Sequence, residues 1–205
     1  MNNLDKLIEK FEKFPGVGAR QAKRFAFHIL RLNEKDTEDL AKLIESLKTN
    51  TKSCQSCQRF FSVNVVNDNY LCNICSDGNR DHSKLLVVAS DNDITPIERS
   101  GIYDGLYFVL GGTAPLLEST SSSLRTKTLT AIIEERLKRD LSEIILAFAV
   151  NPDGENTDRY IISVIEPIIK NSAVIISHLG RGLSTGSELE YADPETIKNA
   201  LVNRH

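Results

Sequence analysis

The sequence predicts an α+β protein built from several consecutive parts, because its residue pattern changes along the chain. Apolar residues recur at helical spacing over residues 1–53, which predicts a helical region. All four cysteines then lie within residues 54–81, as two Cys-x-x-Cys pairs. Residues 82–178 alternate short apolar runs with amphipathic stretches, a pattern typical of an α/β domain whose parallel sheet is covered by helices on both faces. Residues 179–205 follow as a C-terminal tail.

Composition and charge restrict the class of protein. The chain is 40% hydrophobic and 26% charged, as expected of a soluble globular protein. The longest apolar run, Ile144–Val150, is too short to cross a bilayer, and the N-terminus lacks the apolar core of a secretory signal. We therefore expect a cytoplasmic protein with no membrane partner. The net charge is −3, but residues 1–53 carry eleven basic against eight acidic residues, whereas residues 85–205 carry eleven against seventeen. The basic excess near the N-terminus indicates an anionic partner.

Three apolar stripes predict three helices in the N-terminal region. The turn Phe14-Pro15-Gly16-Val17-Gly18 separates the first two, and we expect Asp36 or Thr37 to cap the third. The stripes are Leu4, Leu7, Ile8 and Phe11, then Ala22, Phe25, Ala26, Ile29 and Leu30, and finally Leu40, Leu43, Ile44 and Leu47.

The turn between the first two helices carries the chemical signal of this region. Gly16 and Gly18 permit positive φ and leave backbone N–H groups uncovered, while Val17 between them can pack inward. The second helix thus presents free amides and the positive end of its dipole to an anion.

Basic side chains follow this turn at helical spacing. Arg20, Arg24 and Arg31 share a face opposite the apolar stripe, with Lys23 beside them. The stretch resembles a helix–hairpin–helix, a motif that binds DNA phosphates without reading bases. An ordinary helical hairpin with a solvated basic face is the alternative. His28 is expected to be a packed or capping residue rather than a ligand. The residues that we assign to DNA binding are Gly16, Gly18, Arg20, Lys23 and Arg24.

The four cysteines, Cys54 and Cys57 followed by Cys72 and Cys75, have the spacing of a Cys₄ zinc finger. Each Cys-x-x-Cys pair directs two thiolates to one point, and two pairs complete the tetrahedral cage that Zn²⁺ prefers. The intervening Phe60–Leu71 segment, with Asn67-Asp68-Asn69 as its turn, is expected to be a hairpin that folds one pair onto the other. Two disulfides or four free thiols are the alternatives. A Cys₄ site has no open coordination position, so one structural zinc per chain is expected.

The α/β part is expected to contain four strands and three helices. Gly101 is expected to end the first helix, and Pro167 to kink or end the last one. The polar run Ser119–Ser123 is read as a loop. The predicted strands are Leu85–Ala89, Leu106–Leu110, Glu143–Val150 and Ala173–Ser177, and the predicted helices are Ile94–Ser100, Thr128–Arg139 and Asn156–Lys170.

Acidic segments follow two of these strands, where ligands of parallel sheets bind. They are Ser90-Asp91-Asn92-Asp93 and Asn151-Pro152-Asp153-Gly154-Glu155. A Mg²⁺ site is one interpretation. We favour the other, that these residues cap helices and form turns.

The order of these parts resembles the RecR family of bacterial recombination mediators over essentially the whole chain. The most specific stretches are Phe14–Leu30, the cysteine quartet, Ile97-Glu98-Arg99 with Val109-Leu110-Gly111-Gly112, and Ser187–Asp193. The resemblance implies a Toprim-like α/β domain and a protein that is not an enzyme. It further implies a ring-shaped homotetramer that encircles DNA and works with RecO, and often RecF, at single-strand gaps. Arg20 and Arg24 fall where the family carries its basic DNA-contacting residues.

Three positions depart from the pattern of the family or of catalytic Toprim domains. The span between the cysteine pairs is longer than usual in the family. Ala89 stands where Toprim domains place a glutamate, and Ala149-x-Asn151 replaces the Asp-x-Asp of catalytic ones. A Toprim primase or nuclease, the second function considered, would need these acidic residues. A nucleotide-binding regulator using Gly180–Ser187 is the third, but that segment matches no phosphate-binding pattern and is read as a flexible loop.

Overall fold

The chain is represented by a computed structural model that describes residues 2–63, 70–114, 124–180, 182–183, 186 and 188–202. It divides into two compact units. The N-terminal unit comprises Met1–Lys52 and Ser62–Asn64, and the second unit comprises Ser53–Phe61 and Val65–His205. No helix among the described residues is long and apolar enough to cross a membrane.

The N-terminal unit contains the three predicted helices α1 (Asn3–Glu12), α2 (Ala19–Ile29) and α3 (Glu34–Asn50). Helices α1 and α2 pack together, because the small side chains of Ala22 and Ala26 let the backbones approach and are fully buried. The Phe11 ring meets the edge of Phe25, with 5.9 Å between centroids. The cap predicted for α3 is wrong by three residues or more: the Asn33 side chain accepts a hydrogen bond from the Asp36 backbone N–H and so starts the helix earlier.

Helix α3 differs from α1 and α2 because its apolar stripe remains outside any core. Leu43, Ile44 and Leu47 are each about two-thirds exposed, at 66%, 65% and 64%. The described part of α3 contains no buried residue. An apolar face of this length, on a helix otherwise rich in charge, is not covered by the other described residues of the N-terminal unit.

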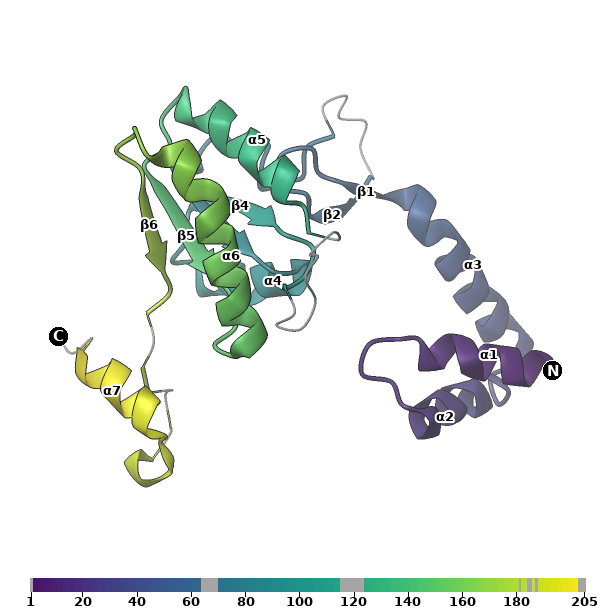
Figure 1. The fold of residues 1–205 in the computed structure, drawn as a ribbon. Coiled ribbons are helices and arrows are strands. Elements are labelled where there is room, and N and C mark those ends of the chain that lie inside the picture. Colours follow the sequence, from purple (N-terminus) through teal and green to yellow (C-terminus); the bar gives the residue numbers. More distant parts are fainter. Residues whose placement is uncertain are drawn as a thin grey trace. The chain divides into compact units, whose positions relative to one another are not determined.

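The second unit is built on a parallel sheet of four strands in the order β4-β3-β5-β6 (Figure 1). The strands are β3 (Asp81–Val88), β4 (Gly105–Val109), β5 (Glu143–Ala147) and β6 (Ile175–His178). At the centre of the sheet, Val87 on β3 lies opposite Phe108 on β4 and Leu146 on β5. All three side chains are buried, as the continuous apolar runs of the sequence predicted.

Helices cover both faces of this sheet, as expected for a parallel sheet. Helices α5 (Thr126–Leu137) and α6 (Pro152–Ile169) lie side by side on one face, and α4 (Asp91–Ser100) lies on the other (Figure 1). The first core therefore joins Leu129 and Ile133 of α5, and Ile161 and Ile165 of α6, to the sheet.

The second core lies on the α4 face, and the cysteine segment completes it. Three cysteines and Ile74 are buried there against Leu86, Val88 and Ile94. Two short strands flank the first cysteine pair and pair with each other: β1 (Thr51–Ser53) and β2 (Phe60–Ser62). The start of the predicted hairpin, strand β2, thus pairs with β1, the strand that precedes the first cysteine pair. Its turn at Asn67-Asp68-Asn69, and the loop predicted at Ser119–Ser123, lie outside the described residues.

Helix caps explain two of the differences from the predicted boundaries in the second unit, at the starts of α4 and α6. Helix α4 begins at Asp91 rather than Ile94, because Ser90 and Asp93 form a capping box, and it ends at Gly101 as predicted. Helix α6 begins four residues before the predicted Asn156, because the Asn151 side chain accepts from the Gly154 backbone N–H. Pro167 lies inside α6, and the helix continues to Ile169. Helix α5 starts two residues earlier than predicted, and β5 stops at Ala147 instead of Val150.

The C-terminal tail contains the short 3₁₀ helix η1 (Leu189–Tyr191) and the helix α7 (Pro194–Val202). Of the Gly180–Ser187 loop, Arg181, Ser184, Thr185 and Ser187 lie outside the described residues.

Gly154 supports a prediction about the second unit. A Cβ at this position would lie 1.9 Å from the Ala149 carbonyl oxygen, so the first turn of α6 packs directly on the loop after β5. We expect Gly154→Ala to lower the free energy of unfolding by about 2 kcal/mol or more, because backbone must shift to admit the methyl group. Urea unfolding measures this. Gly78→Ala is the control, since a Cβ there meets nothing within 4 Å, and an equal loss in both variants would contradict the account.

Candidate metal centre and nucleic-acid interface

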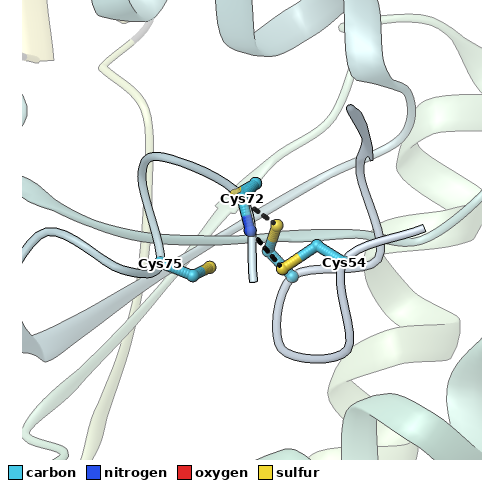
Figure 2. A group of neighbouring side chains, drawn as sticks. Cys54, Cys72 and Cys75 are labelled. Atoms are coloured by element: carbon cyan, nitrogen blue, oxygen red, sulfur yellow. Dashed lines mark hydrogen bonds between the residues drawn. The ribbon is translucent and has the colours of Figure 1, made fainter. Parts of the chain in front are cut away.

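The four predicted cysteine ligands lie close together in the structure. Cys54 and Cys72, for example, are joined by a hydrogen bond although they are 18 residues apart in the sequence. The sulfur atoms all lie within 4.8 Å of one another, and the Sγ atoms of Cys57 and Cys72 are 3.6 Å apart. Figure 2 shows the side chains of Cys54, Cys72 and Cys75 converging from their two loops. Cys54, Cys57 and Cys72 are buried, and Cys75 is partly buried.

The geometry fits a tetrahedral metal ion. Four sulfurs each about 2.3 Å from a zinc ion would be about 3.8 Å apart. The observed 3.6 Å is close to this value and far longer than a disulfide bond, which excludes the alternative of two disulfides in this structure. The four cysteines therefore form a metal-binding group.

The electrostatics of the cluster also favour a cation. Hydrogen bonding to the Cys57, Cys72 and Cys75 thiols lowers the pKa of Cys54, whereas the hydrogen bond to Cys54 and burial raise the pKa of Cys57. Thiols this close cannot all become thiolates without a compensating charge. A divalent ion supplies that charge and holds all four deprotonated.

Hydrogen bonds attach the first cysteine loop to the sheet. The Val109 N–H on β4 donates to the Cys57 carbonyl at 2.8 Å, and the Arg125 guanidinium donates to the Gln58 carbonyl at 3.0 Å. Gln58 has a positive φ of 64°, which is uncommon for a residue with a side chain. The Asp91 carboxylate accepts from the Phe60 N–H at 2.7 Å. The loop is thus positioned by β4, by the N-terminus of α4 and by the residue before α5.

A second group of partly buried polar residues attaches the chain after Cys75. Both oxygens of Glu98 on α4 accept from the Arg80 guanidinium, which also donates to the Gly105 carbonyl. The Tyr107 hydroxyl donates to Glu98 at 2.6 Å. Burial raises the pKa of Glu98, but the bonds from Arg80 and Tyr107 outweigh burial and keep the pKa below its usual value. The carboxylate is therefore held ionised, as a fixed anchor.

Of the two glycines in the candidate DNA-binding turn, only one has the positive φ that the sequence analysis considered. Gly16 adopts a φ of +73°, the left-handed conformation that favours glycine. Gly18 instead has a φ of −84° and is the N-cap of α2, with no side-chain cap for the helix. A Cβ on either glycine would meet nothing within 4 Å. Val17 is half-buried, as predicted.

The basic residues of α2, and Arg31 just after this helix, lie on an exposed surface, as the sequence predicted. Arg20, Lys23, Arg24 and Arg31 are all exposed and line a shallow groove that also includes Phe27. The first turn of α2 contains no acidic residue. His28 is exposed in the last turn of α2, so the expectation of a packed histidine is wrong.

At the carboxyl edge of the sheet, Asp91, Asp93 and Asn151 cap helices or bind neighbouring backbone, as we favoured. Asp93 accepts from the Ser90 N–H at 2.7 Å, and Asn151 caps α6. The Ala89 carbonyl accepts from both Gly111 and Gly112, at 3.0 and 2.9 Å. In the nearby cavity lined by Glu155, Asp158 and His178, the His178 ring contacts Asp158, with 3.0 Å between Nε2 and Oδ1.

Sequence patterns did not single out Arg80, Arg125 or Arg136. Their partners lie 18, 67 and 80 residues away in the chain, at Glu98, Gln58 and Ser56. Pairing over such distances leaves no local periodicity. Glu98 was within a stretch that the resemblance marked, but its partner was not.

Family models match three segments of the chain. Residues 4–48 match the helix-hairpin-helix of RecR, residues 83–179 match the Toprim domain, and residues 182–205 match the C-terminal segment of RecR. These matches confirm the predicted fold class.

Curated relatives match almost from end to end. The recombination protein RecR of Rhodopirellula baltica is 36% identical over 199 residues, covering 97% of this chain and 94% of that protein. RecR of Staphylococcus aureus strain Newman is 36% identical and RecR of Streptococcus thermophilus 35%, each over 202 residues that cover 98% of this chain and 96% of the relative. With this coverage and identity, the chain belongs to the RecR family of recombination proteins.

Proposed function

We propose that the chain is a non-catalytic DNA-binding protein that acts in DNA recombination and repair. In this proposal it assembles into a clamp on DNA at single-strand gaps and works there with RecO and RecF. The observation that carries the proposal is the N-terminus of α2, which is uncapped by any side chain and followed by an exposed row of basic residues in a helix-hairpin-helix segment. The names of the relatives support a role in recombination.

DNA binding is assigned to Gly16, Gly18, Arg20, Lys23 and Arg24. Gly18 needs neither positive φ nor space for its own fold, so nothing inside the described chain requires glycine there. A backbone left bare at a helix N-terminus permits close approach of a phosphate oxygen. Arg20 and Arg24 lie one turn apart and extend the contact to neighbouring phosphates. These contacts do not involve base edges, so binding is independent of sequence.

The metal of the cysteine cluster is proposed to be Zn²⁺, one per chain, held by Cys54, Cys57, Cys72 and Cys75. Four cysteines whose sulfur atoms all lie within 4.8 Å of one another are the donor set typical of structural zinc. Zinc would supply a fixed cross-link between the two loops. Because all four positions around the ion would be filled, no substrate could bind to it.

The absence of catalysis is proposed from the carboxyl edge of the sheet. Magnesium-dependent cleavage of DNA requires a cluster of carboxylates that can hold the ion. Here Ala89 offers only its carbonyl, and that accepts two backbone hydrogen bonds. Asp91 and Asp93 bind Phe60 and Ser90. A side chain at position 154 would clash with the Ala149 backbone, so glycine is needed there for packing and not for a catalytic role.

Assembly into a homotetrameric ring is proposed because one basic helix per chain offers few phosphate contacts to a protein of net charge −3. Several copies add their contacts at high effective concentration. The exposed stripe of α3 is the surface that we assign to contact between copies. We further propose a cytoplasmic location and the division into residues 1–53, 54–81, 82–178 and 179–205.

The zinc proposal predicts that Cys72→Ser abolishes stoichiometric metal binding and lowers stability. Cys72 lies at the centre of the cluster, and the core on the α4 face is built around it. A structural zinc contributes on the order of 10 kcal/mol of apparent binding free energy. Metal analysis after purification under reducing conditions, together with thermal unfolding, measures both effects. Parent protein that contains no zinc would overturn the proposal.

The DNA proposal predicts that Arg20→Ala and Arg24→Ala weaken binding equally for all sequences. Each change should reduce the slope of log affinity against log salt by about one, because one phosphate contact is lost. Fluorescence anisotropy with gapped DNA at several salt concentrations measures this. Lys35→Ala on α3 is the control of equal charge change. Unchanged affinity in the double variant, or cleavage of the DNA during incubation with Mg²⁺ or Mn²⁺, would contradict the proposal.

The assembly proposal predicts that a double substitution, Leu43→Glu and Leu47→Glu, produces smaller particles and weaker DNA binding. Both side chains are mostly exposed in the single chain, so the folded subunit should keep its stability. Sedimentation velocity and the anisotropy assay give the two results. Ala41→Glu, an exposed position of the same helix, serves as the control. If a monomeric variant bound DNA as tightly as the parent, the clamp proposal would be wrong.

A further inference from the structure

Arg136, in the last turn of α5, is a partly buried cation beside the cysteine cluster. Its Nη2 donates to the Ser56 hydroxyl at 3.2 Å, and Ser56 lies between Cys54 and Cys57. Its Nη1 is buried and has no hydrogen-bond partner among the residues that the structure describes. Arg136 and Cys75 line the same cavity. Helix α5 therefore brings an unsatisfied donor to the edge of the metal-binding group.

The surroundings of Arg136 lack a carboxylate committed to it. Glu135 is bound by Arg139 at 2.7 Å, and both of these side chains are mostly exposed. His82 and Asp140 also line the cavity, and Asp140 is exposed. Burial lowers the pKa of the Arg136 guanidinium, whereas the nearby Cys75 thiol and, more weakly, Tyr103, Glu135 and Cys57 act to raise it. Since arginine remains protonated in proteins, its charge needs an anionic partner.

A metal bound by four thiolates provides such an anion. Four charges of −1 and one of +2 leave about −2 on the cluster, spread over the sulfurs. Hydrogen bonds from N–H groups to those sulfurs compensate part of this charge. One such bond is present already, from the Cys72 N–H to Cys54 Sγ at 3.4 Å.

We propose that Arg136 is the counter-cation of the metal–thiolate cluster and that its Nη1 donates to the Cys75 sulfur when the metal is bound. This inference rests on the proposed zinc site and deepens it. Arg136 is a positioning residue: it stabilises the charged cluster, lowers the nucleophilicity of Cys75, and links the metal to α5 on the opposite core of the sheet. Outer hydrogen bonds of this kind typically change metal affinity 10- to 100-fold.

The test compares Arg136→Met, which removes the charge but keeps an extended side chain, with Arg136→Lys, which keeps the charge without the planar fork. Lys138→Met is the control, because it removes the same charge from an exposed position two residues further along the chain. Zinc affinity is measured by chelator competition. Cobalt-substituted protein reports the sulfur-to-metal charge-transfer bands, and alkylation with iodoacetamide followed by mass spectrometry gives a rate for each cysteine.

We expect Arg136→Met to bind zinc 10- to 100-fold more weakly, to shift the charge-transfer bands to lower energy, and to be alkylated about tenfold faster at Cys75. Arg136→Lys should fall between this variant and the parent, and Lys138→Met should match the parent. Should Arg136→Met fail to fold, faster alkylation of Cys75 in Arg136→Lys still supports the inference, and a parental rate overturns it.

Two results in folded Arg136→Met would overturn the inference while leaving the zinc proposal intact. One is parental zinc affinity with an unshifted cobalt spectrum. The other is faster alkylation of all four cysteines by the same factor, which would indicate loosened packing. A parent protein without metal would instead overturn the zinc proposal itself.

Discussion

Convergence of four cysteine sulfurs on one point is the constraint on which the second unit depends. The cysteine loops are short and contain few apolar side chains, so a shared metal centre would contribute much of their stability. Once held, they cover the α4 face of the sheet, where Cys54, Cys57 and Cys72 are core residues in their own right. The Val109 N–H then donates to the Cys57 carbonyl, and the Arg125 guanidinium donates to the Gln58 carbonyl. The metal-binding group and α4 thus cover this face of the sheet together.

The N-terminal unit differs from the second unit because few of its described residues are buried. Ala22 and Ala26 permit α1 and α2 to pack closely, but the apolar stripe of α3 has no partner within the described chain. A surface with one exposed apolar helix and one exposed basic helix is suited to two partners of different chemistry. In our account, other copies of the chain cover the first, and DNA binds to the second.

Structural features that depend on local sequence pattern could be predicted, whereas features that depend on contacts between residues far apart in the chain could not. The parallel sheet, the buried strands and the four cysteines could be predicted, because apolar runs and ligand spacing are local signals. Helix starts were misplaced by up to four residues, since Asn33, Ser90 and Asn151 act as caps before the apolar pattern begins. Strand order and the roles of Arg80, Arg125 and Arg136 could not be predicted, because each is fixed by residues far away in the chain.

Amide hydrogen exchange of the intact protein, before and after the metal is removed by a chelator under reducing conditions, tests most directly whether the metal-binding group is part of the core. The account predicts faster exchange at Val109, whose N–H donates to Cys57, and throughout α4, while Ile161 and Ile165 in α6 keep more of their protection. Protection at Val109 and in α4 that survives complete loss of metal would contradict the central claim.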